Sequence, residues 1–166
     1  MSTDITIIIK DRKIKICQNV IDVFYDYIQS DIFLRESGGI LIGKENRSNT
    51  NIIIKYITTP MTNDKCKRFE FLRIDKAHLE MFKKLYNSSR HTLRYIGEWH
   101  THSEKIPHFS KKDLNNWRKI CIESNNDKDY YHVIVGQNAV RMWMIDKDND
   151  SVELICTILW KDMIKS

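Results

Sequence analysis

The amino-acid sequence predicts an α+β fold in one domain that spans residues 1–166. Three observations support this prediction. A chain of 166 residues with 42% apolar and 30% charged residues suits one soluble domain with one hydrophobic core. Many short segments have the apolar periodicity of strands, and three longer segments have that of helices. No internal repeat, proline-rich linker or low-complexity tract divides the chain, which contains two prolines, Pro60 and Pro107.

The expected strands are short runs that are rich in β-branched residues or alternate between apolar and polar side chains. The first two, at 5–9 and 13–17, are separated by a charged turn. Two later turns, at 138–139 and 146–150, separate the last three strands. In order, the expected strands cover residues 5–9, 13–17, 39–43, 51–58, 69–74, 93–99, 130–136, 139–145 and 151–160.

Three helices are expected, at 18–30, 75–88 and 110–123. In the first, apolar residues recur at three- and four-residue spacing, so one face of the helix should pack on the sheet. Asp75 is placed to cap the start of the second helix, and Ser110 the start of the third. The polar segment at 59–68 reads as a long loop, and its position between strands makes it a candidate flap over a substrate.

Charge and composition exclude several classes of protein. The net charge is +5, but lysines are spread along the chain, which favours a solvated surface over a nucleic-acid site. No apolar run approaches the roughly 20 residues needed to span a membrane, and the first residues lack the pattern of a signal peptide. We therefore expect a cytoplasmic protein. Four scattered cysteines without a CxxC pair indicate reduced thiols: Cys17, Cys66, Cys121 and Cys156.

The segment from His100 to Asp113 carries the pattern expected of a catalytic metal site. Side chains alternate along a strand, so His100 and His102 at a strand end point to the same side. A seven-residue loop then leads to a helix whose first turn contains Asp113. Two nitrogens and one oxygen suit zinc, and three protein ligands leave one coordination position for water. The sequence therefore predicts one catalytic Zn²⁺ with water as its fourth ligand.

Each part of this pattern also has a simpler structural interpretation. Ser110 and Asp113 have the spacing of a helix capping box, and a lone pair of histidines is more often a solvated strand end. Together the two parts are more specific than either alone. Capping and metal ligation can also coexist in one side chain.

A metal-dependent hydrolase also needs a group that moves protons, and the sequence offers two candidates. Glu98 lies two residues before His100 and shares its face of the strand. Glu36 lies just before a glycine-rich strand that could run beside the histidines. Local sequence alone does not choose between these two glutamates.

Two segments, ESGGILIG (36–43) and GEWHTHSEKIPHFSKKD (97–113), resemble the signature of the JAMM, or MPN-plus, metalloproteases. The resemblance extends in order of elements over roughly residues 5–160. It implies a cytidine-deaminase-like JAB/MPN fold, a mixed curved sheet flanked by about three helices. The GEWHTH segment and the chain length are similar to those of the small bacterial JAB peptidases of antiphage islands, including the deconjugating peptidase associated with CBASS.

The resemblance implies a role for each residue of the pattern. It implies that His100, His102 and Asp113 hold zinc, that Glu36 rather than Glu98 is the general base and acid, and that Ser110 stabilises the oxyanion. The reaction would be hydrolysis of an isopeptide bond.

The resemblance also implies partners. The substrate would be a protein conjugate joined through a ubiquitin-like or nucleotidyltransferase carboxyl-terminal tail, made by an E1/E2-like conjugating system.

Alternatives are a non-catalytic scaffold module of the same fold, a peptidase that processes a sulfur carrier, and a JAB protein associated with DNA repair. Many family members have proline after the second histidine and before the serine, where this chain has Ser103 and Phe109.

Overall fold

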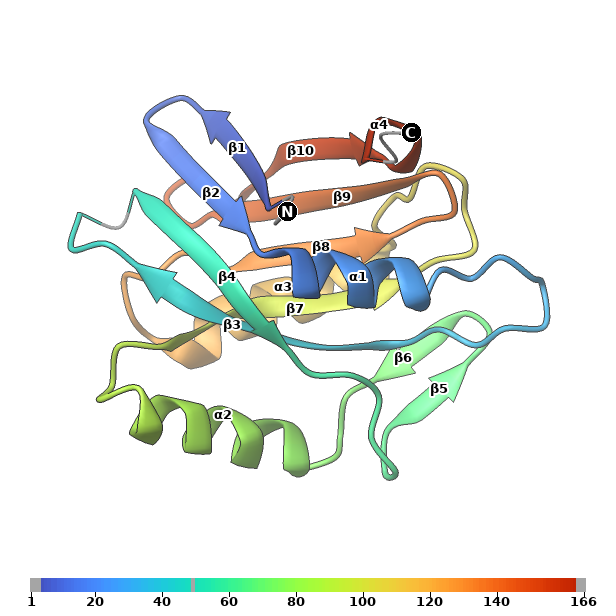
Figure 1. The fold of residues 1–166 in the computed structure, drawn as a ribbon, viewed down its shortest axis with the longest axis horizontal. Helices are drawn as coiled ribbons and strands as arrows, with labels where there is room; N and C mark the ends of the chain where they lie inside the picture. The colour runs from blue at the N-terminus through green and yellow to red at the C-terminus, as the bar shows by residue number, and fades with distance from the viewer. Residues whose placement is uncertain (1–3, 49, 164–166) are drawn as a thin grey trace.

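The computed structural model describes residues 4–48 and 50–163, and its central feature is a twisted eight-stranded sheet (Figure 1). The strand order is β1-β2-β4-β3-β7-β8-β9-β10. These strands are β1 (Ile5–Ile9), β2 (Arg12–Ile16), β3 (Gly38–Glu45), β4 (Asn51–Ile57), β7 (Arg94–Thr101), β8 (Tyr131–Val135), β9 (Ala139–Asp146) and β10 (Ser151–Leu159). A separate hairpin is formed by β5 (Lys65–Lys67) and β6 (Glu70–Leu72).

The sheet is mixed, as the resemblance to the JAB/MPN fold implies. Most neighbouring strands are antiparallel, but β2 pairs with β4 and β7 pairs with β8 in parallel. A parallel pair needs a long crossover connection. The crossover from β7 to β8 contains helix α3 (Lys111–Ser124), which brings the start of that helix back toward the end of β7.

Helices cover both faces of the sheet, and each face has its own apolar core. Helix α1 (Gln18–Asp26) packs through Val20, Ile21 and Phe24 on the face that contains Trp99. Helix α2 (Ala77–Ser88) and helix α3 pack on the opposite face, where Trp117 of α3 joins Trp143 of β9. A short helix, α4 (Trp160–Met163), follows β10.

The structure departs from the expected bounds of several elements, among them α1, β5 and β7. Helix α1 ends at Asp26 rather than residue 30, because the buried Gln29 amide donates to the Leu34 carbonyl at 3.1 Å and holds the chain in a turn. Strand β5 lies within the segment 59–68, which was expected to be a loop. Strand β7 continues to Thr101, two residues further than expected. None of the described helices is long and apolar enough to cross a membrane.

Candidate metal-dependent active site

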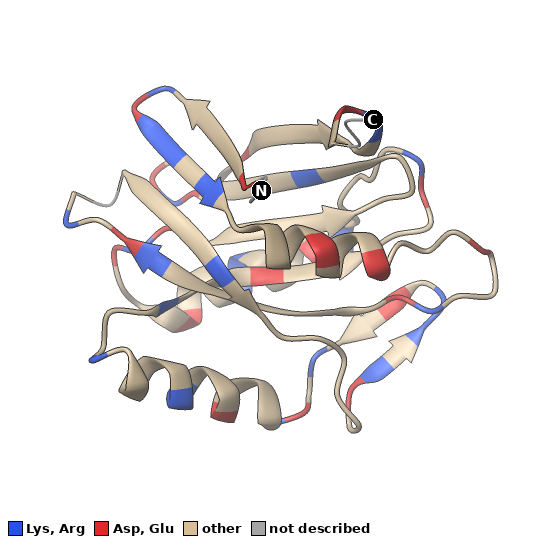
Figure 2. Ribbon diagram, viewed as in Figure 1, with Lys and Arg blue, Asp and Glu red and all other residues tan. Residues whose placement is uncertain are grey.

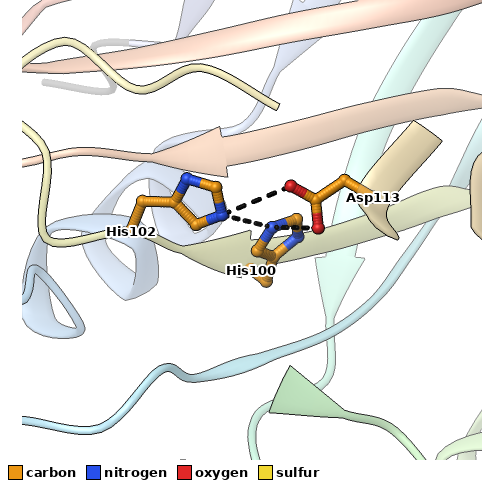
Figure 3. Close-up of side chains that lie close together, drawn as sticks. All are labelled: His100, His102 and Asp113. Carbon is orange, nitrogen blue, oxygen red and sulfur yellow. Dashed lines mark hydrogen bonds and ion pairs between the residues drawn. The ribbon is translucent and has the colours of Figure 1, made fainter. Parts of the chain in front are cut away.

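His100 and His102 lie at the end of β7 and point to the same side of the sheet, as strand alternation predicts (Figure 3). Their Nε2 atoms are 3.0 Å apart. Trp99 points the other way into the core, where its indole N–H donates to the Thr58 carbonyl at 2.9 Å. The buried Trp99 side chain therefore anchors the end of β7 in the core, and the two imidazoles project from the opposite face of the strand.

Asp113 reaches the histidines from the first turn of α3. Its Oδ1 lies 3.2 Å from His100 Nε2, and its Oδ2 lies 3.4 Å from His102 Nε2. The Asp113 carboxylate also accepts the Ser110 backbone N–H at 2.7 Å, and Ser110 Oγ accepts the Asp113 N–H at 3.1 Å. The capping box is present, so one aspartate side chain both caps the helix and faces the histidines.

The spacing of these three side chains fits a tetrahedral metal ion. Zinc bonds of about 2.0–2.1 Å place ligand atoms about 3.3 Å from one another. The two Nε2 atoms are 3.0 Å apart, and the two Asp113 oxygens lie 3.2 and 3.4 Å from one Nε2 atom each, which is close to that distance. With one ligand atom from each residue, the three atoms lie within 4.8 Å of one another. His102 Nδ1 lies 2.9 Å from Glu104 Oε1, a contact that favours a proton on Nδ1 and leaves the Nε2 lone pair facing the cluster. The donor set is thus suitable for zinc.

Glu36 lies beside the cluster because β3 pairs antiparallel with β7. Gly38 pairs with His100, and continuing this register by two residues places Glu36 opposite His102. Glu36 Oε1 lies 3.9 Å from His102 Nε2. The close pairing requires glycine at 38, since a Cβ there would lie 2.4 Å from the Trp99 carbonyl oxygen. The structure therefore brings together Glu36 and the three residues that the sequence predicts as metal ligands.

The pKa values of the cluster are shifted by burial and by the charges of neighbouring side chains. Burial raises the pKa of Glu36 to about 7, and the nearby charge of Asp113 adds to this shift. Burial lowers the pKa of His102, but hydrogen bonding to Asp113 and the charge of Glu36 outweigh it and raise that pKa to about 8. Burial disfavours the Asp113 anion, yet its contacts with both histidines hold its pKa well below the usual range. The two carboxyl groups favour a positive charge between them.

Glu98 shares the face of the histidines but has other partners. Its Oε1 accepts from Arg73 Nε at 2.8 Å and from the Tyr95 hydroxyl at 2.8 Å. Arg73 Nη2 lies 2.7 Å from the same oxygen. The Glu98 carboxylate is therefore held by a cation and a phenol, whereas Glu36 faces His102.

A groove of about 470 Å³ opens over the cluster. One wall is the β5–β6 hairpin and the residues that follow it, including Phe69, Phe71 and Arg73. The other wall is helix α3, with Asn116 and Ile120. None of residues 59–68 lines this groove, whose wall begins at Phe69, so the expectation that segment 59–68 forms a flap over a substrate stays a prediction.

Ser110 is the N-cap residue of α3 and lines the same groove. Its hydroxyl oxygen accepts from Asp113, and the hydroxyl proton is still available to a second group. Phe109, which replaces a common proline, packs on Trp117 and Trp143 with ring centroids 5.4 and 5.7 Å away. This aromatic anchor fixes the loop by packing rather than by proline stiffness.

Sequence reasoning missed several residues that support the site. Thr101 donates its hydroxyl to Gln29 Oε1 at 2.9 Å and accepts the Ser37 N–H at 3.0 Å, joining the end of β7 to the segment that carries Glu36. Glu104 orients His102. Glu104 lies two residues after His102, and this short spacing could have indicated the contact from the sequence. The contact between Thr101 and Gln29 joins residues far apart in the sequence, so no sequence pattern indicates it.

The fold and the site together define a class of protein: an α+β domain with a His-His-Asp cluster at a strand end and a buried glutamate opposite. The family model described as "Prokaryotic homologs of the JAB domain" matches residues 18–146, which include both signature segments. The chain belongs to this family, and the resemblance seen in its sequence is confirmed.

Three similar proteins are each named "CD-NTase/cGAS isopeptidase". The protein from Pseudomonas aeruginosa is 29% identical over 128 residues, covering 77% of this chain and 80% of its own length. The one from Escherichia coli is 33% identical over 107 residues, covering 64% and 67%. The one from Vibrio cholerae is 27% identical over 155 residues, covering 92% and 95%.

A solved structure supports the fold independently. A protein from Desulfitobacterium hafniense, known from its solution structure, superposes with a TM-score of 0.58 at 15% identity. The match covers 85% of this chain and 88% of that protein. At this identity the likeness concerns the fold alone.

Proposed function

We propose that the chain is a zinc-dependent isopeptidase that hydrolyses the amide bond joining a carboxyl-terminal protein tail to its target. The observation that carries the proposal is the cluster of His100, His102 and Asp113 beside a buried Glu36 on the floor of an open groove. The names of the three relatives support the reaction class. The complete residue set favours catalysis over a scaffold role without chemistry.

In this proposal His100, His102 and Asp113 hold the ion through one imidazole nitrogen each and one carboxylate oxygen. Zinc supplies Lewis acidity when bound, both to a water molecule and to the scissile carbonyl. Glu36 removes a proton from the attacking water and passes it to the leaving amine nitrogen. Ser110 donates a hydrogen bond from its hydroxyl group to the oxygen on which negative charge develops.

The proposed substrate is a conjugate of a CD-NTase or of a ubiquitin-like protein, joined through its carboxyl terminus by an E1/E2-like system. The relatives' names favour the CD-NTase. The groove has room for an extended peptide but not for a folded domain, which agrees with a tail as the bound segment. The proposed setting is the cytoplasm of a bacterium with CBASS-type antiphage signalling.

A cleavage assay with a CD-NTase fused through its carboxyl terminus to green fluorescent protein tests this proposal. We expect Glu36→Gln to lower kcat at least about 100-fold while zinc content stays near one ion per chain, because the base lies outside the ligand set. His100→Ala should lose both zinc and cleavage. Glu98→Gln should retain cleavage, because its carboxylate is occupied by Arg73 and Tyr95.

Three results would contradict the assignment. Full activity of Glu36→Gln would remove the proposed base, and stoichiometric zinc in His100→Ala would remove that ligand. Cleavage that is lost in Glu98→Gln but kept in Glu36→Gln would reverse the choice between the two glutamates.

A further inference from the structure

Four large apolar side chains are exposed on the β5–β6 hairpin and on the connection beside it. Three are consecutive in the connection from α1 to β3: Ile32, Phe33 and Leu34, with exposed fractions of 59%, 84% and 44%. The fourth is Phe69, 70% exposed, in the turn of the β5–β6 hairpin. We call these four residues the apolar rim. Scattered exposed apolar residues are ordinary, but a group of them marks an interaction site.

The structure fixes the two halves of the apolar rim next to each other. The buried Gln29 amide lies 3.1 Å from the Leu34 carbonyl and 3.5 Å from the Arg68 carbonyl. The Glu36 N–H donates to the Lys67 carbonyl at 2.8 Å. In Figure 1 the connection after α1 accordingly runs along the turn of the hairpin.

The exposure of the apolar rim is built into an ordered turn. Asp31 accepts the Phe33 N–H through its carboxylate at 2.9 Å, and its carbonyl accepts the Leu34 N–H at 3.2 Å. These bonds hold the backbone that carries the three exposed apolar side chains in a defined turn. A preformed turn also lowers the entropy lost when a partner binds.

Cations lie on the hairpin side of the apolar rim (Figure 2). Arg35 follows Leu34 directly, and Lys65, Lys67 and Arg68 lie on the hairpin. Arg68 stacks on Phe69 with its guanidinium 4.7 Å from the ring centre. Lys67 faces Glu70, but within residues 4–48 and 50–163 Arg35, Lys65 and Arg68 have no ion-pair partner. Nearby Asp31 and Glu70 are already occupied by a backbone N–H and by lysines, respectively.

The apolar rim is continuous with the candidate active site. Phe69 belongs to the rim and also lines the groove, as does Glu36, one residue beyond Arg35. A protein whose tail lies in the groove must place its folded body against the mouth of the groove. The apolar rim is therefore in the position that such a body would cover.

We propose that the apolar rim and the cations beside it dock the folded body of the substrate protein, through an apolar face on that protein bordered by carboxylates. This proposal rests on the proposed function, since it concerns the partner of the same site. Three of the four apolar side chains project from one turn, and two of these are aliphatic, which suits a protein face better than stacked bases. Because the cations beside the rim are unpaired, a complementary partner surface should carry negative charge.

Comparison of two substrates tests the proposal. The first is the CD-NTase fusion described above, and the second is a fluorogenic peptide with only the tail sequence. We expect Phe33→Ser and Arg68→Glu each to raise KM for the fusion about tenfold, with kcat and peptide cleavage unchanged, because central apolar and arginine contacts dominate interfaces. Raising the salt concentration should raise KM for the fusion with the unmodified protein and less with Arg68→Glu.

Matched controls are available elsewhere on the surface. Ile8→Ser removes an apolar side chain of similar exposure, 75%, from strand β1, and Lys84→Glu reverses an exposed charge on α2. Both should leave KM for the fusion unchanged. Equal losses in the controls and the test variants would overturn the proposal, as would an unchanged KM in Phe33→Ser and Arg68→Glu.

Failure of the proposed function gives a different result from failure of the docking surface. If the unmodified protein cleaves neither substrate, the proposed function is wrong, and binding of the intact CD-NTase by Glu36→Gln still tests the surface. Binding that Phe33→Ser and Arg68→Glu leave unchanged would then overturn the docking proposal. Salt-dependent binding of duplex DNA that Arg68→Glu weakens and Phe33→Ser does not would assign the cations to nucleic acid and also overturn it.

Discussion

His132 is a fully buried imidazole whose two ring nitrogens have no hydrogen-bond partner among the described residues. It stacks on Trp117 with ring centroids 4.7 Å apart. Burial lowers the pKa of His132 to about 3, with a further contribution from His100. The side chain is therefore neutral in the folded protein and charged in the unfolded chain below its ordinary pKa of about 6.5.

This difference in pKa predicts a loss of stability in acid. As pH falls below 6.5, the unfolded chain gains a proton that the folded protein does not, so the free energy of unfolding decreases. From pH 7 to pH 5 the contribution of His132 is about 2 kcal/mol. His132→Leu should lack this component, which urea unfolding of both proteins at the two pH values would reveal. An identical change in both proteins would show that His132 does not titrate as described.

At the scale of elements, Asp64 fastens the base of the β5–β6 hairpin. Its Oδ1 accepts the N–H groups of Ile74 and Asp75 at 3.0 and 2.9 Å, just beyond β6. Its Oδ2 lies 2.6 Å from His78 Nε2 in α2, and His78 Nδ1 lies 2.6 Å from the buried Thr58 hydroxyl. One carboxylate thus ties the hairpin wall of the groove to a helix and to the end of β4.

Asp64→Ala should loosen this hairpin without disturbing the candidate metal ligands. The exposed Ile74 N–H, the partly buried Asp75 N–H and the buried His78 imidazole lose their acceptor. An unsatisfied buried polar group costs about 1–3 kcal/mol. We expect faster hydrogen exchange over residues 59–75 and a higher KM, while zinc content stays unchanged. Asp64→Asn retains an acceptor oxygen and should show a smaller effect. Hydrogen exchange that rises equally in β8 would instead indicate general destabilisation.

Sequence patterns anticipated elements and sites to the extent that the governing interactions are local. Strand alternation placed His100 and His102 on one face, and the capping spacing located the start of α3. Sequence patterns did not decide whether Glu36 or Glu98 is the general base, because the pairing of β3 with β7 joins residues far apart in sequence. Strand β5 was missed because three residues of alternating lysine and cysteine within a polar segment carry no strand signal.

At the scale of the whole molecule, a metal ion at the cluster would join the central sheet to α3. A ligand that binds only the folded state raises stability by mass action, by about 2.7 kcal/mol at a concentration 100 times its Kd. We expect zinc to raise the Tm of the metal-free protein, and His100→Ala to show no such rise. Thermal unfolding with and without a chelator measures this. Equal responses of the two proteins would place the bound zinc elsewhere.

The separation of the site along the chain has a consequence for the order in which it forms. His100, His102 and Asp113 lie within one segment of 14 residues, so little loop-closure entropy opposes their meeting. Glu36 reaches them only through pairing between distant strands, the kind of contact that forms slowly. In the proposed enzyme, the three metal ligands would therefore meet before the general base joins them, and the folding chain would be able to bind zinc before it could cleave a substrate.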